Sequence, residues 1–307
     1  MYQGDKTKGK LKKSSELLLL CIPGAILVII FKYLPMFGLV LAFKDYRYNK
    51  GFFGSEWSGF ENFKFFFTSQ DAWRITRNTV GMNLLFIIAS TVVSLVAAIL
   101  LNEIINKRMV KVYQTTMFFP YFLSWVVVAY ILSTFINERY GMINSLLKSI
   151  GLESLSAYTT PGYWPFIFLI AFIWKGAGYG CIIYYAGIMG IDTEYYKAAA
   201  IDGASKFQMI TKITIPMLMP IVTIMTLLSI GKIFYADFGM FYFLPQDIGM
   251  LYPTTDVIDT FVYRTLRVTG EVGLATAVGF YQAVVGLILV LLSNYSVRKY
   301  DKEYALY

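Results

Sequence analysis

Few residues in this sequence of 307 residues could carry out covalent catalysis or bind a metal ion. There is no histidine, and the two cysteines, Cys21 and Cys181, both lie inside apolar runs. The missing histidine excludes Ser–His–Asp catalysis and histidine-ligated metal sites, and two thiols cannot hold a zinc ion by themselves. Thiols in apolar surroundings are ordinarily small buried hydrophobic residues. We therefore expect no covalent catalysis and no metal site in this chain.

Charged residues inside or beside apolar runs are the next candidates. Lys175 stands within such a run, where a charge is costly and marks either a water-filled path or a side chain that reaches the interface. Asp237 follows another apolar run among aromatic residues, and its carboxylate could accept sugar hydroxyls beside ring faces. Aromatic residues make up 18% of the chain, so a single ring is more often a packing residue than a binding one.

The segment 191–216 between two apolar runs has a pattern of its own. Asp192 can cap a short helix, and Glu194 favours its positive end. Three alanines from Ala198 form helix with almost no side-chain bulk, and Gly203 allows a turn because it tolerates positive φ. We expect a short helix that another protein can approach closely. On composition alone, an ordinary loop helix explains these residues equally well.

The spacing in this segment resembles the EAA signature of the permeases of ABC importers. In that signature Glu-Ala-Ala is followed by three residues, Gly, nine residues and Ile-x-Leu-Pro. Two residues depart from it: Lys197 stands in place of Glu, which reverses a charge, and Ile215 stands in place of Leu. The matching positions are Ala198, Ala199, Gly203, Ile213 and Pro216, and Asp202-Gly203-Ala204 is similar to the Asp-Gly-Ala common in sugar importers. The resemblance implies that these residues, with Lys197, dock on an ATPase.

Further segments resemble the polysaccharide-type (LplB-like) branch of the carbohydrate-importer permeases. They are 38–46, Asn62-Phe63, 237–242, 252–260, Tyr281-Gln282 and Arg298-Lys299. The resemblance implies an oligosaccharide substrate, a second and non-identical permease, two cytoplasmic ATPase subunits and an extracellular lipoprotein that binds the solute. No G-x-x-x-x-G-K-[ST] motif occurs, so ATP and magnesium belong to the ATPase and this chain binds no cofactor. We expect Lys175, Asp237 and Tyr281 to line a path that is completed by the second permease.

The composition shows which elements must position these residues. Apolar residues make up 57% of the chain, and the mean hydropathy is +0.57. This apolar content is higher than is typical of soluble globular domains. Several apolar runs are long enough to cross a bilayer. We predict an all-α membrane protein with about six spans, at about 17–43, 79–101, 116–136, 163–189, 213–235 and 273–294. The docking loop, about 190–212, then lies between spans 4 and 5.

The charge of +8 does not indicate nucleic-acid binding, because the basic residues flank apolar runs instead of forming one patch. We expect a basic tail over 1–16, a single permease domain over 17–307, and both termini on the cytoplasmic side of a bacterial inner membrane. Three alternatives stay open. They are an ABC importer for another solute, a secondary transporter, which usually needs ionisable groups at mid-membrane, and a membrane-embedded enzyme.

Overall fold

The fold is described from a computed structural model of residues 19–300. The basic tail expected at 1–16 lies outside the described residues. In this part of the chain five helical segments are long and apolar enough to span a membrane, and a bent pair of helices gives a sixth candidate. The predicted all-helical fold with about six spans is confirmed.

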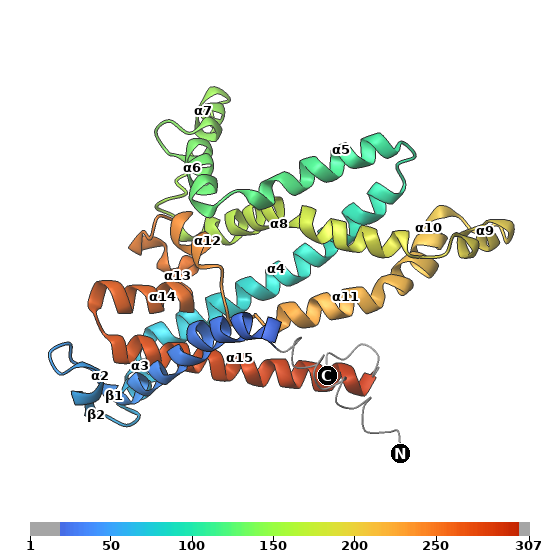
Figure 1. Cartoon of the computed structure of the whole chain (residues 1–307). Helices are drawn as coiled ribbons and strands as arrows, with labels where there is room; N and C mark the ends of the chain where they lie inside the picture. Colours follow the sequence, from blue (N-terminus) through green and yellow to red (C-terminus); the bar gives the residue numbers. More distant parts are fainter. Residues whose placement is uncertain (1–18, 301–307) are drawn as a thin grey trace, which may run out of the picture.

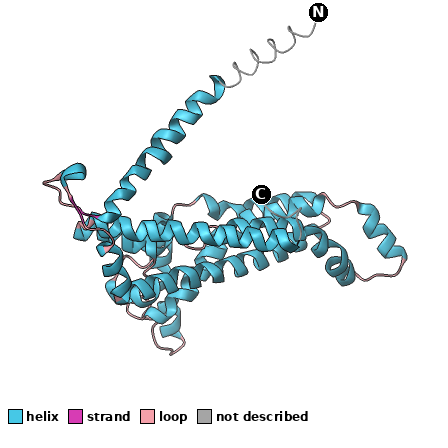
Figure 2. Ribbon diagram, turned by 90° about the horizontal axis from the view of Figure 1, so that it is seen from below, coloured by secondary structure: helices cyan, strands magenta, loops and turns pink. Residues whose placement is uncertain are grey.

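Five long helical segments make up most of the molecule, and all but the first run side by side in a bundle (Figures 1 and 2). They are Leu19–Phe43, which includes η1 (Ile29–Tyr33) and η2 (Leu34–Phe43); α4 (Gln70–Asn102); η4 (Pro161–Tyr163) with α8 (Trp164–Met189); α10 (Lys206–Met209) with η5 (Ile210–Thr214) and α11 (Ile215–Ile230); and α15 (Val272–Tyr300).

The first of these segments leaves the bundle. Figure 2 shows it projecting away from the other helices, and most of its apolar side chains are exposed. It joins the bundle at η2, which packs against α15. A hairpin follows at the same end, with strand β1 antiparallel to β2 and Lys44 paired with Trp57. The elements here are β1 (Lys44–Asp45), α2 (Gly51–Gly54), β2 (Glu56–Trp57) and α3 (Glu61–Thr68).

Helix α4 begins nine residues earlier than the sequence predicted, because polar residues extend the apolar span. The Ser69 hydroxyl accepts a hydrogen bond from Ala72 N at 3.3 Å, which caps the helix. Asp71 lies in the first turn, where a negative charge is favoured. Part of the region expected as a loop at 44–78 is therefore the beginning of α4.

The predicted third span is broken. Helix α5 (Lys107–Phe118) leads through η3 (Phe119–Phe122) to α6 (Trp125–Ile136), and the chain bends by 100° between η3 and α6. Pro120 lies in η3, at this break. Ser124 then caps α6 by accepting a hydrogen bond from Val127 N at 3.4 Å. A proline followed by a new N-cap ends one helix and starts another, so the span predicted at 116–136 is bent.

Glycines let α8 pack closely against its neighbours. A Cβ on Gly178 would lie 2.0 Å from the Met117 carbonyl oxygen of α5, and one on Gly180 would lie 2.5 Å from Ser94 Oγ of α4. A Cβ on Gly176 would meet nothing within 4 Å. Gly178 and Gly180 thus let α8 lie close to α5 and α4, and α8 remains a continuous helix.

Shorter elements cover the two ends of the bundle. Helices α9 (Thr193–Ile201) and α10 lie at one end. Toward the other end lie α7 (Met142–Ser149), α12 (Phe238–Phe243), η6 (Gly249–Leu251), α13 (Tyr252–Thr255), α14 (Ile258–Arg264) and η7 (Thr265–Thr269). One buried cluster joins α4, α6, α8 and α12 around Trp164 and Phe168, and Trp125 and Phe172, which pack against it, line the site described next.

Candidate functional site

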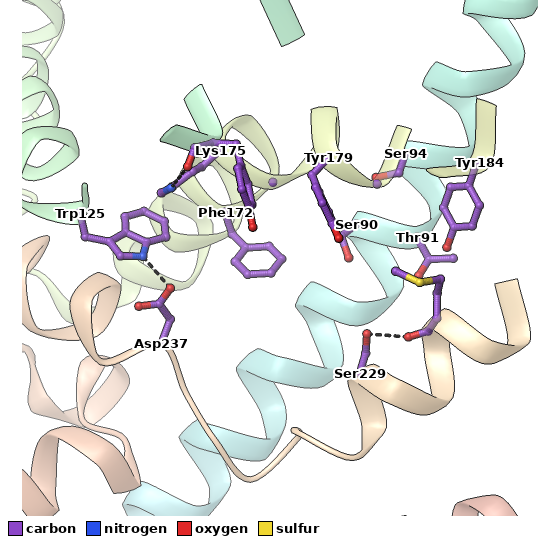
Figure 3. A pocket seen from close by; sticks show the side chains of 14 residues that line it. Ser90, Thr91, Ser94, Trp125, Phe172, Lys175, Tyr179, Tyr184, Ser229 and Asp237 are labelled. Atoms are coloured by element: carbon purple, nitrogen blue, oxygen red, sulfur yellow. Dashed lines mark hydrogen bonds between the residues drawn. The ribbon is translucent and has the colours of Figure 1, made fainter. Parts of the chain in front are cut away.

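A cavity lined by aromatic rings and a few polar groups opens among α4, η3, α6, α8, α11 and the start of α12 (Figure 3). Its volume is about 280 Å³. Hydroxyl groups and aromatic rings line it, together with one basic and one acidic side chain. The lining residues are Ser90, Thr91, Ser94, Tyr121, Trp125, Phe172, Lys175, Gly176, Tyr179, Gly180, Tyr184, Met225, Ser229 and Asp237.

Lys175 is held by a carbonyl and two rings. Its Nζ donates to the Tyr121 carbonyl oxygen at 2.7 Å. The same atom lies 5.3 Å from the ring centre of Tyr121 and 5.4 Å from that of Trp125. Ring faces attract a cation, and this attraction offsets part of the cost of placing the ammonium group in an apolar span.

Asp237 lies on the other side of the same indole. It caps α12 by accepting a hydrogen bond from Met240 N at 3.3 Å, and its other oxygen accepts one from Trp125 Nε1 at 2.6 Å. Figure 3 shows Lys175 and Asp237 on opposite sides of Trp125. The ammonium group of Lys175 and the carboxylate of Asp237 can form hydrogen bonds with a polar solute, while the indole ring between them can stack against it.

The opposite wall of the cavity carries hydroxyl groups. Helix α4 contributes Ser90, Thr91 and Ser94, and Ser94 Oγ donates to the Ala177 carbonyl of α8 at 3.2 Å. Ser229 of α11 donates to the Met225 carbonyl at 2.8 Å. Sequence reasoning missed this wall and Trp125. Three hydroxyl residues within five positions of an apolar helix were the available signal for it.

Tyr281 lies elsewhere. Its ring packs against Phe66 at 5.7 Å, Phe67 at 5.2 Å and Phe234 at 6.0 Å, and its hydroxyl lies 3.4 Å from Thr76 Oγ1. The structure thus brings Lys175 and Asp237 to one cavity but places Tyr281 in a separate aromatic cluster. Helix α15, which carries Tyr281, contributes no residue to the cavity around Lys175, whereas α4 and α6 do.

The segment expected to dock on an ATPase forms the helix that its residues predict. Asp192 caps α9 by accepting a hydrogen bond from Glu194 N at 2.9 Å. Gly203 has a φ of 76°, as we expected for the turn, and Ala204 N donates back to the Ala199 carbonyl at 2.9 Å. This is the glycine-terminated ending typical of a helix C-terminus.

Two side-chain contacts hold this segment to the bundle. Lys206 of α10 pairs with Glu103 after α4 at 2.5 Å, and the Tyr196 hydroxyl lies 2.9 Å from Thr214 Oγ1. No residue of α9 is buried, and Ile201 and Phe207 are 87% and 74% exposed. Exposed apolar side chains on a segment held in place are typical of a protein-docking surface.

The remaining docking residues follow in the next elements. Asp202 ends α9, Ile213 lies in η5 and Pro216 lies in the first turn of α11. Among residues 19–300, Lys197 takes part in no ion pair. In the same part of the chain, no three acidic, histidine or cysteine side chains gather as a metal ion requires.

The family of binding-protein-dependent transport system inner membrane components matches residues 90–302. This chain belongs to that family. A binding-protein-dependent inner membrane component is a transport permease and a membrane protein, which agrees with the long apolar helices and with the cavity among them. The family predicted from the EAA-like spacing is therefore confirmed.

Two relatives from Bacillus subtilis (strain 168) are similar over almost the whole chain. Protein LplB is 36% identical over 293 residues, which cover 95% of this chain and 92% of LplB. The polygalacturonan/rhamnogalacturonan transport system permease protein YteP is 33% identical over 294 residues, which cover 96% of this chain and 91% of YteP. The likeness thus includes the first helix and the hairpin, which precede the matched family region.

Two crystal structures share the fold, each with a TM-score of 0.87 and 33% identity. One is a bacterial ABC transporter involved in the import of the acidic polysaccharide alginate, with 96% of this chain and 99% of that chain covered. The other is a bacterial alginate ABC transporter in complex with an alginate pentasaccharide-bound periplasmic protein, with 96% and 98% covered. The chain therefore has the fold of an ABC-importer permease.

Proposed function

We propose that this chain is one permease subunit of an ATP-driven importer for oligosaccharides. The observation that carries the proposal is the pairing of two features in one chain. A polar and aromatic cavity lies among the spans, and an exposed, anchored loop lies at one end of the bundle. A transporter that uses a separate ATPase needs both a path and a docking surface.

The docking surface is α9 with the turn after it, which contacts the ATPase through Ala198, Ala199, Asp202, Gly203 and Ala204. The small side chains allow close approach, and Ile201 and Phe207 supply apolar contact at its tip. Lys197 is exposed beside them. It reverses the charge found in the EAA signature, so its partner on the ATPase is acidic or absent.

The substrate is an oligosaccharide that contains acidic sugars. The names of two similar proteins refer to the galacturonate polymer polygalacturonan and to the acidic polysaccharide alginate. In this chain, Lys175 supplies a cation in the cavity, while Trp125, Phe172 and Tyr179 supply ring faces for stacking. An ammonium group that is already held by rings can accept a carboxylate without being newly desolvated.

The other parts of the importer are separate chains. A second, non-identical permease completes the path, two ATPase subunits bind the docking loops, and a binding protein delivers the sugar from outside. One similar crystal structure contains a periplasmic protein with bound alginate pentasaccharide. The docking loop then faces the cytoplasm, with both termini of this chain on that side, and α6, α7 and α12 face outward.

Uptake by proteoliposomes that hold both permeases and the ATPase, with the binding protein added outside, tests this function. We expect ATP-driven uptake of labelled galacturonate or alginate tetramers, and no uptake of labelled tetraalanine or leucine. If the peptide or the amino acid entered and the tetramers did not, the importer class would stand and the sugar assignment would be wrong.

A further inference from the structure

A second cavity lies between α6 and α12. It shares no lining residue with the cavity around Lys175. Its volume is about 560 Å³, within the range of roughly 300–1,000 Å³ that small-molecule sites occupy. The residues that give it its chemistry are Tyr130, Ser133, Asn137, Tyr140, Tyr242 and Gln246. It lies toward the end of the molecule opposite α9 and α10 (Figure 1).

The same two helices connect both cavities. Helix α6 begins with Trp125 in the cavity around Lys175 and continues with Tyr130 and Ser133 in the second one. Helix α12 begins with its cap Asp237 in the first cavity and ends near Tyr242 in the second. The two cavities therefore lie along the same pair of helices.

The lining suits sugar rings. Tyr130 and Tyr140 are 73% and 69% exposed, and within residues 19–300 their hydroxyls make no hydrogen bond. Ser133 donates to the Tyr130 carbonyl at 2.9 Å and keeps its acceptor capacity. Ring faces next to hydroxyl and amide groups match a pyranose, which has C–H faces and a rim of hydroxyls. The lining residues of the described chain include no Lys or Arg.

A strained turn fixes one wall of this cavity. Gln246 and Asp247 have φ values of 57° and 49°, and within residues 19–300 they alone among non-glycine residues have positive φ. Such strain persists where the surroundings enforce it, and it clusters at functional sites. Here the Asp247 carboxylate accepts hydrogen bonds from Arg264 Nη1 at 2.8 Å and from the Tyr252 hydroxyl at 3.2 Å.

Arg264 is itself held from several sides. It also pairs with Asp256, whose side chain is fully buried, and its guanidinium lies 4.1 Å from the ring centre of Tyr252. Asp256 pairs in addition with Arg74 of α4 at 2.8 Å. The charge of Asp247 is thus already compensated, and the turn that presents Gln246 is anchored to the bundle.

From these contacts we propose that the α6–α12 cavity is a second carbohydrate site, which binds one or two pyranose units through ring faces and hydroxyls. This proposal rests on the proposed function, because the second site would bind the sugar on the same path through the permease. It differs from the first cavity in that it has no unpaired cation. It therefore holds neutral and acidic sugars alike, whereas the cavity around Lys175 distinguishes them.

A labelling experiment with a matched control tests the second site. In the complete transporter, with Cys21→Ser and Cys181→Ala in this chain, Ser133→Cys or Thr134→Cys is labelled with a maleimide. The two positions are adjacent on α6, and both hydroxyls donate to the Tyr130 carbonyl at 2.9 Å, but Ser133 lines the cavity and Thr134 does not. The probes are galacturonate and alginate tetramers, and uptake is measured in the same preparations.

We expect the tetramer that the transporter imports to slow the labelling of Ser133→Cys about tenfold once its concentration is about ten times Kd. Thr134→Cys should be labelled at an unchanged rate. Uptake without protection of Ser133→Cys would overturn the second site and leave the importer standing. Absence of any oligosaccharide uptake would remove the proposed function and the site together.

Two further results would also contradict the second site. If Ser133→Cys were shielded in the sugar-free permease pair, the cavity would be a contact between the two permeases. If only the sugar-free binding protein shielded it, the cavity would be part of that protein's docking surface. Controls with the sugar, the binding protein and the second permease added separately distinguish these results.

Discussion

At the scale of single residues, the docking turn depends on one backbone angle. Gly203 has a φ of 76°, and a Cβ there would meet nothing within 4 Å. Substitution at this position therefore changes backbone strain without creating a clash. This separates the conformational role of the residue from any role in packing.

We predict that Gly203→Val abolishes transport-coupled ATP hydrolysis while the permease still inserts and pairs with its partner. A β-branched side chain at positive φ costs on the order of 1–3 kcal/mol, which is enough to displace a short loop helix. Gly203→Asn is the matched variant, because asparagine adopts this conformation more readily. Coupled ATPase assays should rank glycine first, asparagine second and valine last. Equal activity of all three proteins would show that the turn is not required.

Lys175 gives a prediction about charge. Lys175→Gln retains a donor for the Tyr121 carbonyl but removes the cation between the two rings. We expect uptake of a galacturonate tetramer to fall about tenfold, which is the effect of losing about 1.4 kcal/mol of binding. Lys175→Arg should retain most of the uptake, since a cation remains over the rings. Equal losses in both variants would show that the size of the side chain matters and its charge does not.

Asp259 gives a prediction about pH. This side chain lies in α14, outside the long spans, and accepts hydrogen bonds from Ala236 N at 2.8 Å and Gln282 Nε2 at 3.1 Å. Burial raises the pKa of Asp259 above its ordinary value, although these two donors lower it, and Asp237 adds to the rise. The protonated carboxyl is therefore favoured in the folded protein. Its stabilisation is fully present below about pH 4, the pKa in the unfolded chain, and is lost as pH rises through the folded pKa.

Thermal unfolding of the purified permease pair, followed from pH 4 to pH 8, measures this effect. The side chain of Asn in Asp259→Asn cannot titrate. The Tm of the variant minus the Tm of the wild type should therefore increase as pH rises. A constant difference between the two Tm values across this range would contradict the assignment to Asp259.

At the scale of elements, the packing of α8 depends on where its glycines lie. Gly178→Ala would place a methyl group 2.0 Å from the Met117 carbonyl oxygen, so α5 and α8 must separate. Gly176→Ala on the same helix meets nothing within 4 Å and gains helix propensity of up to about 1 kcal/mol. We expect Gly178→Ala to lower the Tm of the permease pair and Gly176→Ala to leave it equal or higher. The opposite order would show that α5 and α8 do not pack as described.

Some elements could be predicted from the sequence and others could not. The cap at Asp192 and the turn at Gly203 follow from local residue preferences, and both are present. The break between η3 and α6 was missed, because an apolar run continues through Pro120 and gives no sign of the N-cap formed by Ser124. Hydropathy identifies apolar length, whereas a bend depends on which backbone groups find new partners.

The same limit applies to the site. Lys175 and Asp237 were identifiable as charges in apolar surroundings, but the indole of Trp125 that lies between them comes from a helix whose direction the sequence did not reveal. Tyr281 was selected by resemblance alone and packs into an aromatic cluster. Contacts between distant segments, such as Trp125 with Asp237, depend on tertiary packing and carry no local pattern.

At the scale of the whole molecule, the first helix and the α9–α10 loop extend from the bundle at separate places (Figures 1 and 2). The helix leaves most of its apolar side chains exposed, and the loop presents Ile201 and Phe207. These surfaces are available for contact with lipid or with other chains. This is what the proposed importer requires, because the path and the ATPase belong to different subunits.

The central claim is that this chain transports sugar only as part of an ATP-driven assembly. It is tested most directly by measuring uptake of a labelled galacturonate or alginate tetramer into proteoliposomes while one component at a time is omitted. We predict uptake with both permeases, the ATPase, the binding protein and ATP together, and none when any of them is missing or when the ATPase cannot hydrolyse ATP. Uptake by this chain alone, without ATP, would contradict the account and identify a secondary transporter.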